Sequence, residues 1–257
     1  MATITHKGIK LAYDSRGKGR PAFVFIHGWT CDRSFFAPQA KHFARRHRVV
    51  SLDLRGHGGS DKPQGAYPIS AYVDDIAYLI GTLRLGKVVA VGHSMGGITA
   101  LELAVAHPDK VAAIVMVDPA PLVFPTELRA GVEAIVAAIE AGNQEPRRQF
   151  IANNLFMKTA DKRLVKQVLK VMMAAPSYVA ANAMKGILAY DGVSAAARCT
   201  VPVLHLAATP PLNPPHLMTQ WMPDVVNGWT VGAGHFNMME VPDQVNSMIA
   251  AFLRHYV

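Results

Sequence analysis

The chain has 257 residues, of which 51% are hydrophobic and 17% are charged, and its formal net charge is +8. This length allows one domain with a large core and an insertion, and the composition is too apolar for a disordered chain. The first residues lack the apolar core of a signal peptide, and no apolar run reaches the ~20 residues that a membrane-spanning helix needs. We therefore expect a soluble cytoplasmic protein without a membrane partner.

The cysteines and the positive charge exclude two further classes of protein. Cys31 and Cys199 are the only cysteines, too few for a disulfide framework or a metal cluster, so we expect reduced thiols. Residues 41–48 are strongly basic, but they lack the interleaved stacking aromatics and the recognisable module of a nucleic-acid-binding protein. We interpret this run as a solvated helix end and expect no nucleic-acid partner. Its field would at most steer anionic substrates.

Short β-rich runs alternate with segments of helical periodicity along most of the chain, a pattern typical of an α/β sheet. The later runs are continuously apolar, as expected for parallel strands buried on both faces. Pro242 indicates the start of the last helix. The predicted strands are, in chain order, Ile9–Tyr13, Ala22–Ile26, Val49–Leu52, Val88–Val91, Ala113–Val117, Val201–Leu206 and Val226–Val231.

Residues 120–195 interrupt this alternation, because helical patterns follow one another there without a strand between them. The apolar spacing predicts helices over 128–139, 164–171 and 178–188. We therefore predict a core formed by residues 1–119 and 196–257, with 120–195 as an inserted helical cap. Its methionines either line an adaptable apolar pocket or fill gaps between helices. They are Met157, Met172, Met173 and Met184.

Residues 92–97 read Gly-His-Ser-Met-Gly-Gly, directly after a predicted strand and before a helical pattern. This is Gly-x-Ser-x-Gly in the context of strand, sharp turn and helix, in which a strained turn lifts the serine hydroxyl clear of the sheet edge. Gly92 and Gly96 lack the side chains that would collide as strand and helix close on each other. The helix N-terminus directs backbone N–H groups towards developing negative charge. The motif predicts Ser94 as a nucleophile.

Three more segments have the order and spacing of a known family. Residues 25–29 read Phe-Ile-His-Gly-Trp, residues 53–60 read Asp-Leu-Arg-Gly-His-Gly-Gly-Ser, and residues 232–236 read Gly-Ala-Gly-His-Phe. With these motifs the sequence resembles, over nearly its whole length, the α/β-hydrolase superfamily with a helical cap, and within it serine hydrolases of the carboxylesterase and lactonase type. The resemblance implies a mostly parallel eight-stranded sheet with helices on both faces and an inserted cap. It specifies the fold more closely than the reaction.

A serine hydroxyl needs a base within hydrogen-bond reach, and that base needs an orienting carboxylate. His235 follows the last predicted strand and resembles the family's catalytic histidine. The resemblance also implies an oxyanion hole formed by the backbone N–H groups of Met95 and Trp29. It gives His27 and His93 packing and hydrogen-bonding roles, and places His57 in a structural loop.

The orienting acid departs from the common pattern of the family. Most relatives place it after the strand before the last one, where this chain has Pro210 and Pro211 and no carboxylate. Some members use a carboxylate after the strand that follows the nucleophile helix, and Asp118 occupies that place here. We therefore predict Asp118 as the acid. The alternatives are Asp191, Glu240 or a dyad without an acid.

These residues predict a serine hydrolase that cleaves a small to medium apolar carboxylic ester, lactone or related acyl substrate through an acyl-enzyme. We expect neither a cofactor nor a metal, because no metal-ligand spacing and no nucleotide loop is evident. Dehalogenases and epoxide hydrolases of this fold need a carboxylate where this chain has Ser94. The substrate's identity and the oligomeric state stay open.

Two alternatives remain beside this hypothesis. A cofactor-independent dioxygenase of the same fold would use His235 to deprotonate a hydroxy-oxo heteroaromatic ring, while Ser94 would only hydrogen-bond to it. A non-catalytic binding protein is the other alternative, and the intact Ser94 and His235 argue against it.

Overall fold

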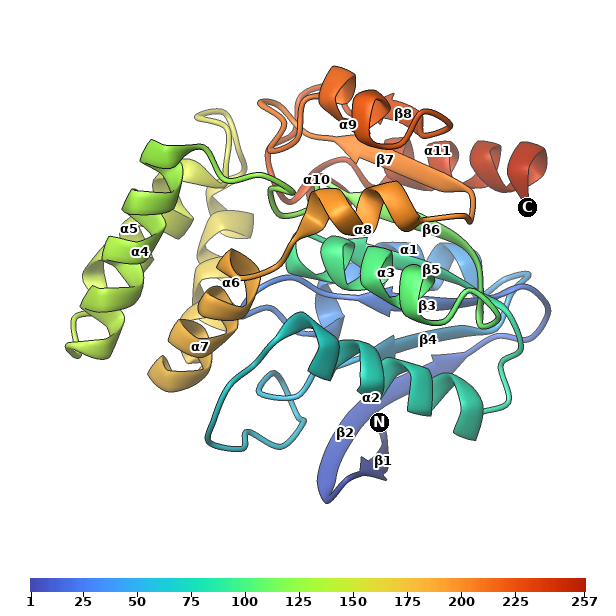
Figure 1. Ribbon diagram of the computed structural model, residues 1–257, viewed down its shortest axis with the longest axis horizontal. Coiled ribbons are helices and arrows are strands. Elements are labelled where there is room, and N and C mark those ends of the chain that lie inside the picture. Colours follow the sequence, from blue (N-terminus) through green and yellow to red (C-terminus); the bar gives the residue numbers. More distant parts are fainter.

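A computed structural model describes residues 1–257, which form one twisted sheet flanked by helices (Figure 1). The order of the eight strands is β1-β2-β4-β3-β5-β6-β7-β8. β2 pairs antiparallel with β1 and β4, and all other neighbours are parallel, so the predicted mostly parallel eight-stranded sheet is confirmed. The strands are β1 (Ala2–His6), β2 (Ile9–Arg16), β3 (Ala22–Ile26), β4 (Val49–Leu52), β5 (Val88–His93), β6 (Val111–Val117), β7 (Val203–Ala207) and β8 (Val226–Trp229).

Helices cover both faces of the sheet. α2 (Ile69–Thr82), α3 (Met95–Ala106) and α8 (Gly192–Arg198) lie on one face, and α1 (Ala37–Phe43) and α11 (Pro242–Tyr256) lie on the other (Figure 1). None of the helices is both long enough and apolar enough to cross a bilayer. Three short elements complete the core: a 3-10 helix η1 (Arg33–Phe36), α9 (Pro215–Trp221) and α10 (Asn237–Glu240).

Four of the five helices between β6 and β7 form a separate group beside the sheet (Figure 1). Three of them match the predicted helices of the insertion, whereas α5 was not predicted. The sequence of α5 is mostly polar, and only Arg147 and Ile151 on it are buried. The predicted end of the insertion at residue 195 falls inside α8, which packs against α3 beside the sheet. The four helices, called the cap below, are α4 (Thr126–Glu140), α5 (Glu145–Asn154), α6 (Lys162–Ala174) and α7 (Ser177–Leu188).

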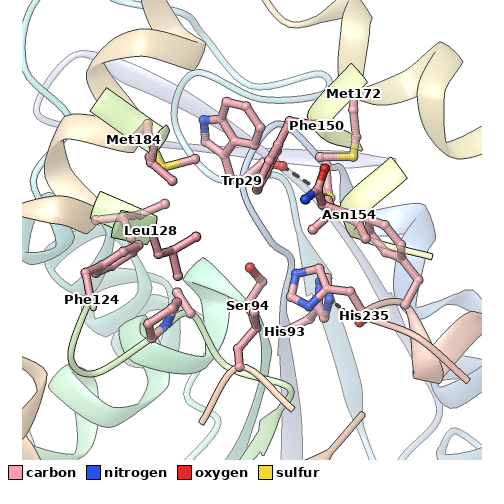
Figure 2. Close-up of a pocket in the computed structure, with 18 residues that line it drawn as sticks. Trp29, His93, Ser94, Phe124, Leu128, Phe150, Asn154, Met172, Met184 and His235 are labelled. Carbon is pink, nitrogen blue, oxygen red and sulfur yellow. Dashed lines mark hydrogen bonds between the residues drawn. The ribbon is translucent and has the colours of Figure 1, made fainter. Parts of the chain in front are cut away.

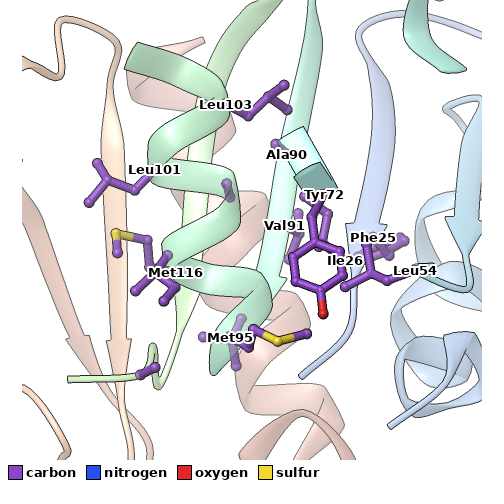
Figure 3. Close-up of a cluster of buried hydrophobic side chains, with 14 of the residues drawn as sticks. Phe25, Ile26, Leu54, Tyr72, Ala90, Val91, Met95, Leu101, Leu103 and Met116 are labelled. Carbon is purple, nitrogen blue, oxygen red and sulfur yellow. The ribbon is translucent and has the colours of Figure 1, made fainter. Parts of the chain in front are cut away.

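The N-terminus of α3 approaches the sheet so closely that two positions leave no room for a side chain. A Cβ atom at Gly92 would lie 1.9 Å from the carbonyl oxygen of Gly96. A Cβ atom at Gly96 would lie 2.0 Å from the carbonyl oxygen of Ile26 in β3. Figure 3 shows the core next to this contact, where apolar side chains of α2 and α3 pack on strands β3 and β5. This packing determines where the turn between β5 and α3 lies.

The substitution Gly96→Ala tests this close approach. Because the added methyl group meets backbone atoms that cannot rotate away, we expect the free energy of unfolding to fall by about 1–3 kcal/mol. Gly131→Ala is the matched control, because Gly131 lies in the exposed part of helix α4 and a Cβ atom there meets nothing within 4 Å. Helix propensity should make that variant about 1 kcal/mol more stable. Urea denaturation measures the free energy of unfolding of both variants. Equal changes in the two variants would contradict the close packing of α3 on the sheet.

Burial lowers the pKa of four of the buried histidines, His27, His57, His93 and His205. The pKa of His57 falls to about 3, mainly because the charged imidazole would lose its hydration. Its Nδ1–H donates to the carbonyl oxygen of Arg55 at 2.8 Å. In the same region His27 donates to Gly28 O and accepts the N–H of Leu54 through Nε2, which holds the two loops together.

These histidines make stability depend on pH. The unfolded chain binds protons below the ordinary histidine pKa of about 6.5, and the folded chain does not, so stability is lost as the pH falls from 7 towards 5. For His57 alone the loss over this interval is about 2 kcal/mol. We expect His57→Gln to show a shallower dependence of the unfolding free energy on pH than the parent chain. Identical slopes in urea titrations at several pH values would contradict a neutral buried His57.

Candidate active site

Ser94 lies in the turn between β5 and α3 and has a strained backbone. Its φ of 53° and ψ of −118° fall in a region that costs a non-glycine residue about 1–3 kcal/mol. The close packing of α3 on the sheet maintains this conformation, and the backbone N–H of Ser94 donates to Val117 O at 3.1 Å. The side chain points into a pocket between the sheet edge and the cap (Figure 2). The elbow geometry expected from Gly-x-Ser-x-Gly is therefore present.

His235 and Asp118 form a buried pair. His235 Nδ1 lies 2.6 Å from Asp118 Oδ2, and the two residues are 8% and 0% exposed. An aspartate carboxylate only accepts hydrogen bonds, so the imidazole proton lies on Nδ1 and Nε2 is left as an acceptor. The pair thus selects the tautomer that a general base needs.

The second carboxylate oxygen of Asp118 is held by the loop after β7. Oδ1 accepts the backbone N–H groups of Ala208 at 3.3 Å and Leu212 at 3.4 Å. Asn213 fastens the same loop to the segment after β6, because its side chain donates to Pro119 O and accepts the N–H of Leu122, each at 2.8 Å. The loop after β7, which has no carboxylate of its own, therefore supplies hydrogen-bond donors to Asp118, directly after the neighbouring strand β6.

The two alternative acids have other partners. Asp191 is exposed and caps α8 by accepting the N–H of Ser194 at 3.1 Å. Glu240 accepts the N–H of Gly234 at 3.1 Å, and burial raises its pKa. Neither carboxylate is hydrogen-bonded to the imidazole of His235, whereas Asp118 is.

Ser94 and His235 line the same pocket, and no hydrogen bond joins the hydroxyl to the imidazole. In unliganded sites such bonds are often long and tighten only when substrate binds. His93 supports the loop that carries His235 (residues 232–236, called the histidine loop below). Its Nε2–H donates to His235 O at 2.9 Å, and the two ring centroids are 4.5 Å apart. Burial lowers the pKa of His93 well below its usual value, so this support is uncharged at neutral pH.

Two backbone N–H groups beside Ser94 are free to bind an anion. Met95 is the first residue of α3, and the first N–H groups of a helix have no intrahelical acceptor. The backbone N–H of Trp29 donates to no protein acceptor. Gly28 brings this loop close, because a Cβ atom there would lie 3.2 Å from Ser94 Cβ and 2.8 Å from His93 Nδ1. The segment 27–29, called the oxyanion loop below because it is predicted to bind the oxyanion, therefore lies against the turn that carries Ser94.

The pocket has a volume of about 190 Å³ and a mostly apolar wall. Thirteen of its 18 lining residues are hydrophobic, and Asn154 is the one polar side chain besides His93, Ser94 and His235 (Figure 2). Met172 and Met184 line it, whereas Met157 and Met173 do not. No group of three or more His, Cys, Asp or Glu side chains is arranged to hold a metal ion.

Sequence reasoning missed the contribution of α5, from which Phe150 and Asn154 reach the pocket. Glu145 and Pro146 at its first turn were the available signal, because acidic residues and proline favour a helix start. Leu212 also lines the pocket, and nothing local to its proline-rich segment predicts this.

Comparisons with known proteins agree with the fold. A family model described as "alpha/beta hydrolase fold" matches residues 21–183. A 2-(acetamidomethylene)succinate hydrolase of Mesorhizobium japonicum is 38% identical over 136 residues, which are 53% of this chain and 47% of that protein. The matches span about half or less of the curated relatives' length.

Solved structures resemble the chain over nearly its full length. A thermophilic esterase from Thermogutta terrifontis has a TM-score of 0.87 at 25% identity, with 98% of this chain and 96% of that chain covered. An E-2-(acetamidomethylene)succinate hydrolase has a TM-score of 0.80 at 27% identity, with 98% and 100% covered. The family model, the sheet order and the Gly-x-Ser-x-Gly turn lead to one conclusion: the chain belongs to the α/β-hydrolase fold family.

Proposed function

We propose that the protein is a serine hydrolase that cleaves small to medium apolar carboxylic esters, lactones or related acyl substrates. The observation that carries this proposal is the 2.6 Å contact between His235 and Asp118 in a pocket that also holds the strained Ser94. The relatives named as hydrolases and an esterase support the same reaction class.

In the proposed mechanism Ser94 Oγ attacks the substrate carbonyl carbon, and its proton passes to His235 Nε2. Asp118 stabilises the imidazolium that forms. The backbone N–H groups of Trp29 and Met95 bind the oxyanion, and each such donor lowers the barrier by about 3 kcal/mol. His235 then protonates the leaving group, and afterwards it activates the water that hydrolyses the acyl-enzyme.

The pocket wall limits the substrate. A cavity of about 190 Å³ is small beside the roughly 300–1,000 Å³ of common ligand pockets, so it favours a short acyl group. Phe124, Leu128 and Met184 lie on the side of Ser94 away from His235 (Figure 2), which suits an apolar acyl chain. Since His235 protonates the leaving group, that group lies on the side of His235 and Asn154.

We expect Asp118→Asn to lower kcat/KM for p-nitrophenyl acetate by about 10³–10⁴-fold, because an amide stabilises the wrong imidazole tautomer and not the imidazolium. Asp191→Asn is the matched control and should keep the parent activity, since Asp191 only caps α8. Steady-state hydrolysis assays measure both. Full activity of Asp118→Asn would indicate a dyad, and a large loss with Asp191→Asn would contradict the assignment of the acid.

The substitution Ser94→Ala distinguishes the hydrolase from a cofactor-independent dioxygenase. A hydrolase should lose nearly all ester turnover, at least about 10³-fold, because the nucleophile is gone. Fluorophosphonate labelling of the parent chain should modify Ser94 and abolish hydrolysis. Retention of most ester turnover by Ser94→Ala would contradict Ser94 as the nucleophile. Oxygen consumption with a hydroxy-oxo heteroaromatic substrate, mostly retained in Ser94→Ala, would favour the dioxygenase.

A further inference from the structure

Trp29 and His235, two residues of the proposed catalytic machinery, are hydrogen-bonded to the cap and to the residue that follows α5. The indole Nε1–H of Trp29 donates to the carbonyl oxygen of Ala180 in α7 at 2.8 Å. The backbone N–H of His235 donates to the carbonyl oxygen of Leu155, which follows α5, at 3.0 Å. The oxyanion loop and the histidine loop, which both belong to the core, therefore each carry a hydrogen bond to the cap or to the residue that follows α5.

A buried arginine in the cap lies against the same tryptophan. Arg147 of α5 is 1% exposed, and its guanidinium carbon is 5.5 Å from the centroid of the Trp29 ring. No carboxylate pairs with it. Its Nη atoms donate to the carbonyl oxygens of Met172 and Ala175 at the end of α6 and to Gln144 Oε1, and its Nε has no partner.

Burial of this charge is unfavourable, and it lowers the pKa of Arg147 to about 10. The partial negative charge at the C-terminus of α6 and the face of the indole offset part of that cost. The arrangement thus connects three parts of the chain, because Arg147 belongs to α5 and its guanidinium contacts the end of α6 and Trp29 of the core.

The histidine loop is also in close contact with the chain after α5. A Cβ atom at Gly234 would lie 3.0 Å from Met157 N and 3.1 Å from Leu155 O. The rings of Phe156 and Phe236 are 5.0 Å apart between centroids. The chain after α5 therefore lies directly on the loop that carries His235, with no space for a larger residue between them.

We propose that Arg147 is a positioning residue, which holds the Trp29 segment so that its backbone N–H is directed at the oxyanion. The proposal rests on the proposed hydrolase function. Arg147 does not line the pocket, so its removal leaves the contacts with bound substrate in place. Its effect falls on the transition state, where a displacement of about 1 Å can cost on the order of 10²-fold in rate.

The test compares Arg147→Met with Arg148→Met. Methionine replaces the unpaired buried charge by an apolar group, so the variant should fold. We expect kcat for p-nitrophenyl acetate to fall about 10–100-fold while KM changes less than about twofold, as for loss of an interaction made only in the transition state. Arg148 is the neighbouring, exposed residue of α5, ion-paired with Glu145 at 3.9 Å, and its replacement should leave kcat unchanged.

Arg147→Lys is the second variant, which keeps a positive charge but has no planar guanidinium to lie on the indole. We expect a kcat between those of the parent and Arg147→Met. Parent-like kcat in both Arg147 variants, or a rise in KM with unchanged kcat, would overturn the proposal.

A second measurement does not depend on activity. Hydrogen exchange of the Trp29 indole N–H, followed by NMR, should be slow in the parent and in Arg148→Met and at least about tenfold faster in Arg147→Met. If the exchange is unchanged, Arg147 does not position Trp29, whatever the enzyme hydrolyses. If the exchange changes but the parent chain hydrolyses no ester, the proposed function fails and the positioning contact stands.

Discussion

The close approach of helix α3 to strands β3 and β5 is the constraint on which the rest of the molecule depends. Gly92 and Gly96 permit it, because a Cβ atom at either position would overlap a backbone carbonyl oxygen. The turn between strand and helix then has room only for a strained Ser94 with a φ of 53°. As a result the hydroxyl lies above the sheet edge and next to the first free N–H groups of the helix. Position, strain and electrostatic environment of Ser94 therefore have one cause.

The proposed acid, Asp118, lies at the sheet edge between two segments that are adjacent in the fold. β6 ends directly before Asp118, and the loop after β7 has prolines where a carboxylate is common in the family. That loop still contributes, since two of its backbone N–H groups bind Asp118 and Asn213 fastens it to the neighbouring segment. In the proposed arrangement the acid follows β6, and its hydrogen-bond donors come from the loop after the neighbouring strand β7.

Much of the core could be predicted because its signals are local. Buried parallel strands are continuous apolar runs, and the nucleophile turn has its own glycine pattern. Strand β1 was missed because it is an exposed edge strand of mixed polarity, and α5 because only Arg147 and Ile151 on it are buried. The contacts of Arg147 with Trp29 and of Leu155 with His235 join segments far apart in the chain, so no local pattern could reveal them.

The central claim is that Ser94 carries the acyl group during turnover. Mass spectrometry of the parent protein, quenched in acid during hydrolysis of p-nitrophenyl acetate, tests it most directly. The account predicts a mass increase of one acetyl group that maps to the peptide containing Ser94 and disappears when the substrate is exhausted. Sustained ester turnover without an acetyl group on Ser94, under conditions where deacylation is slower than acylation, would contradict it.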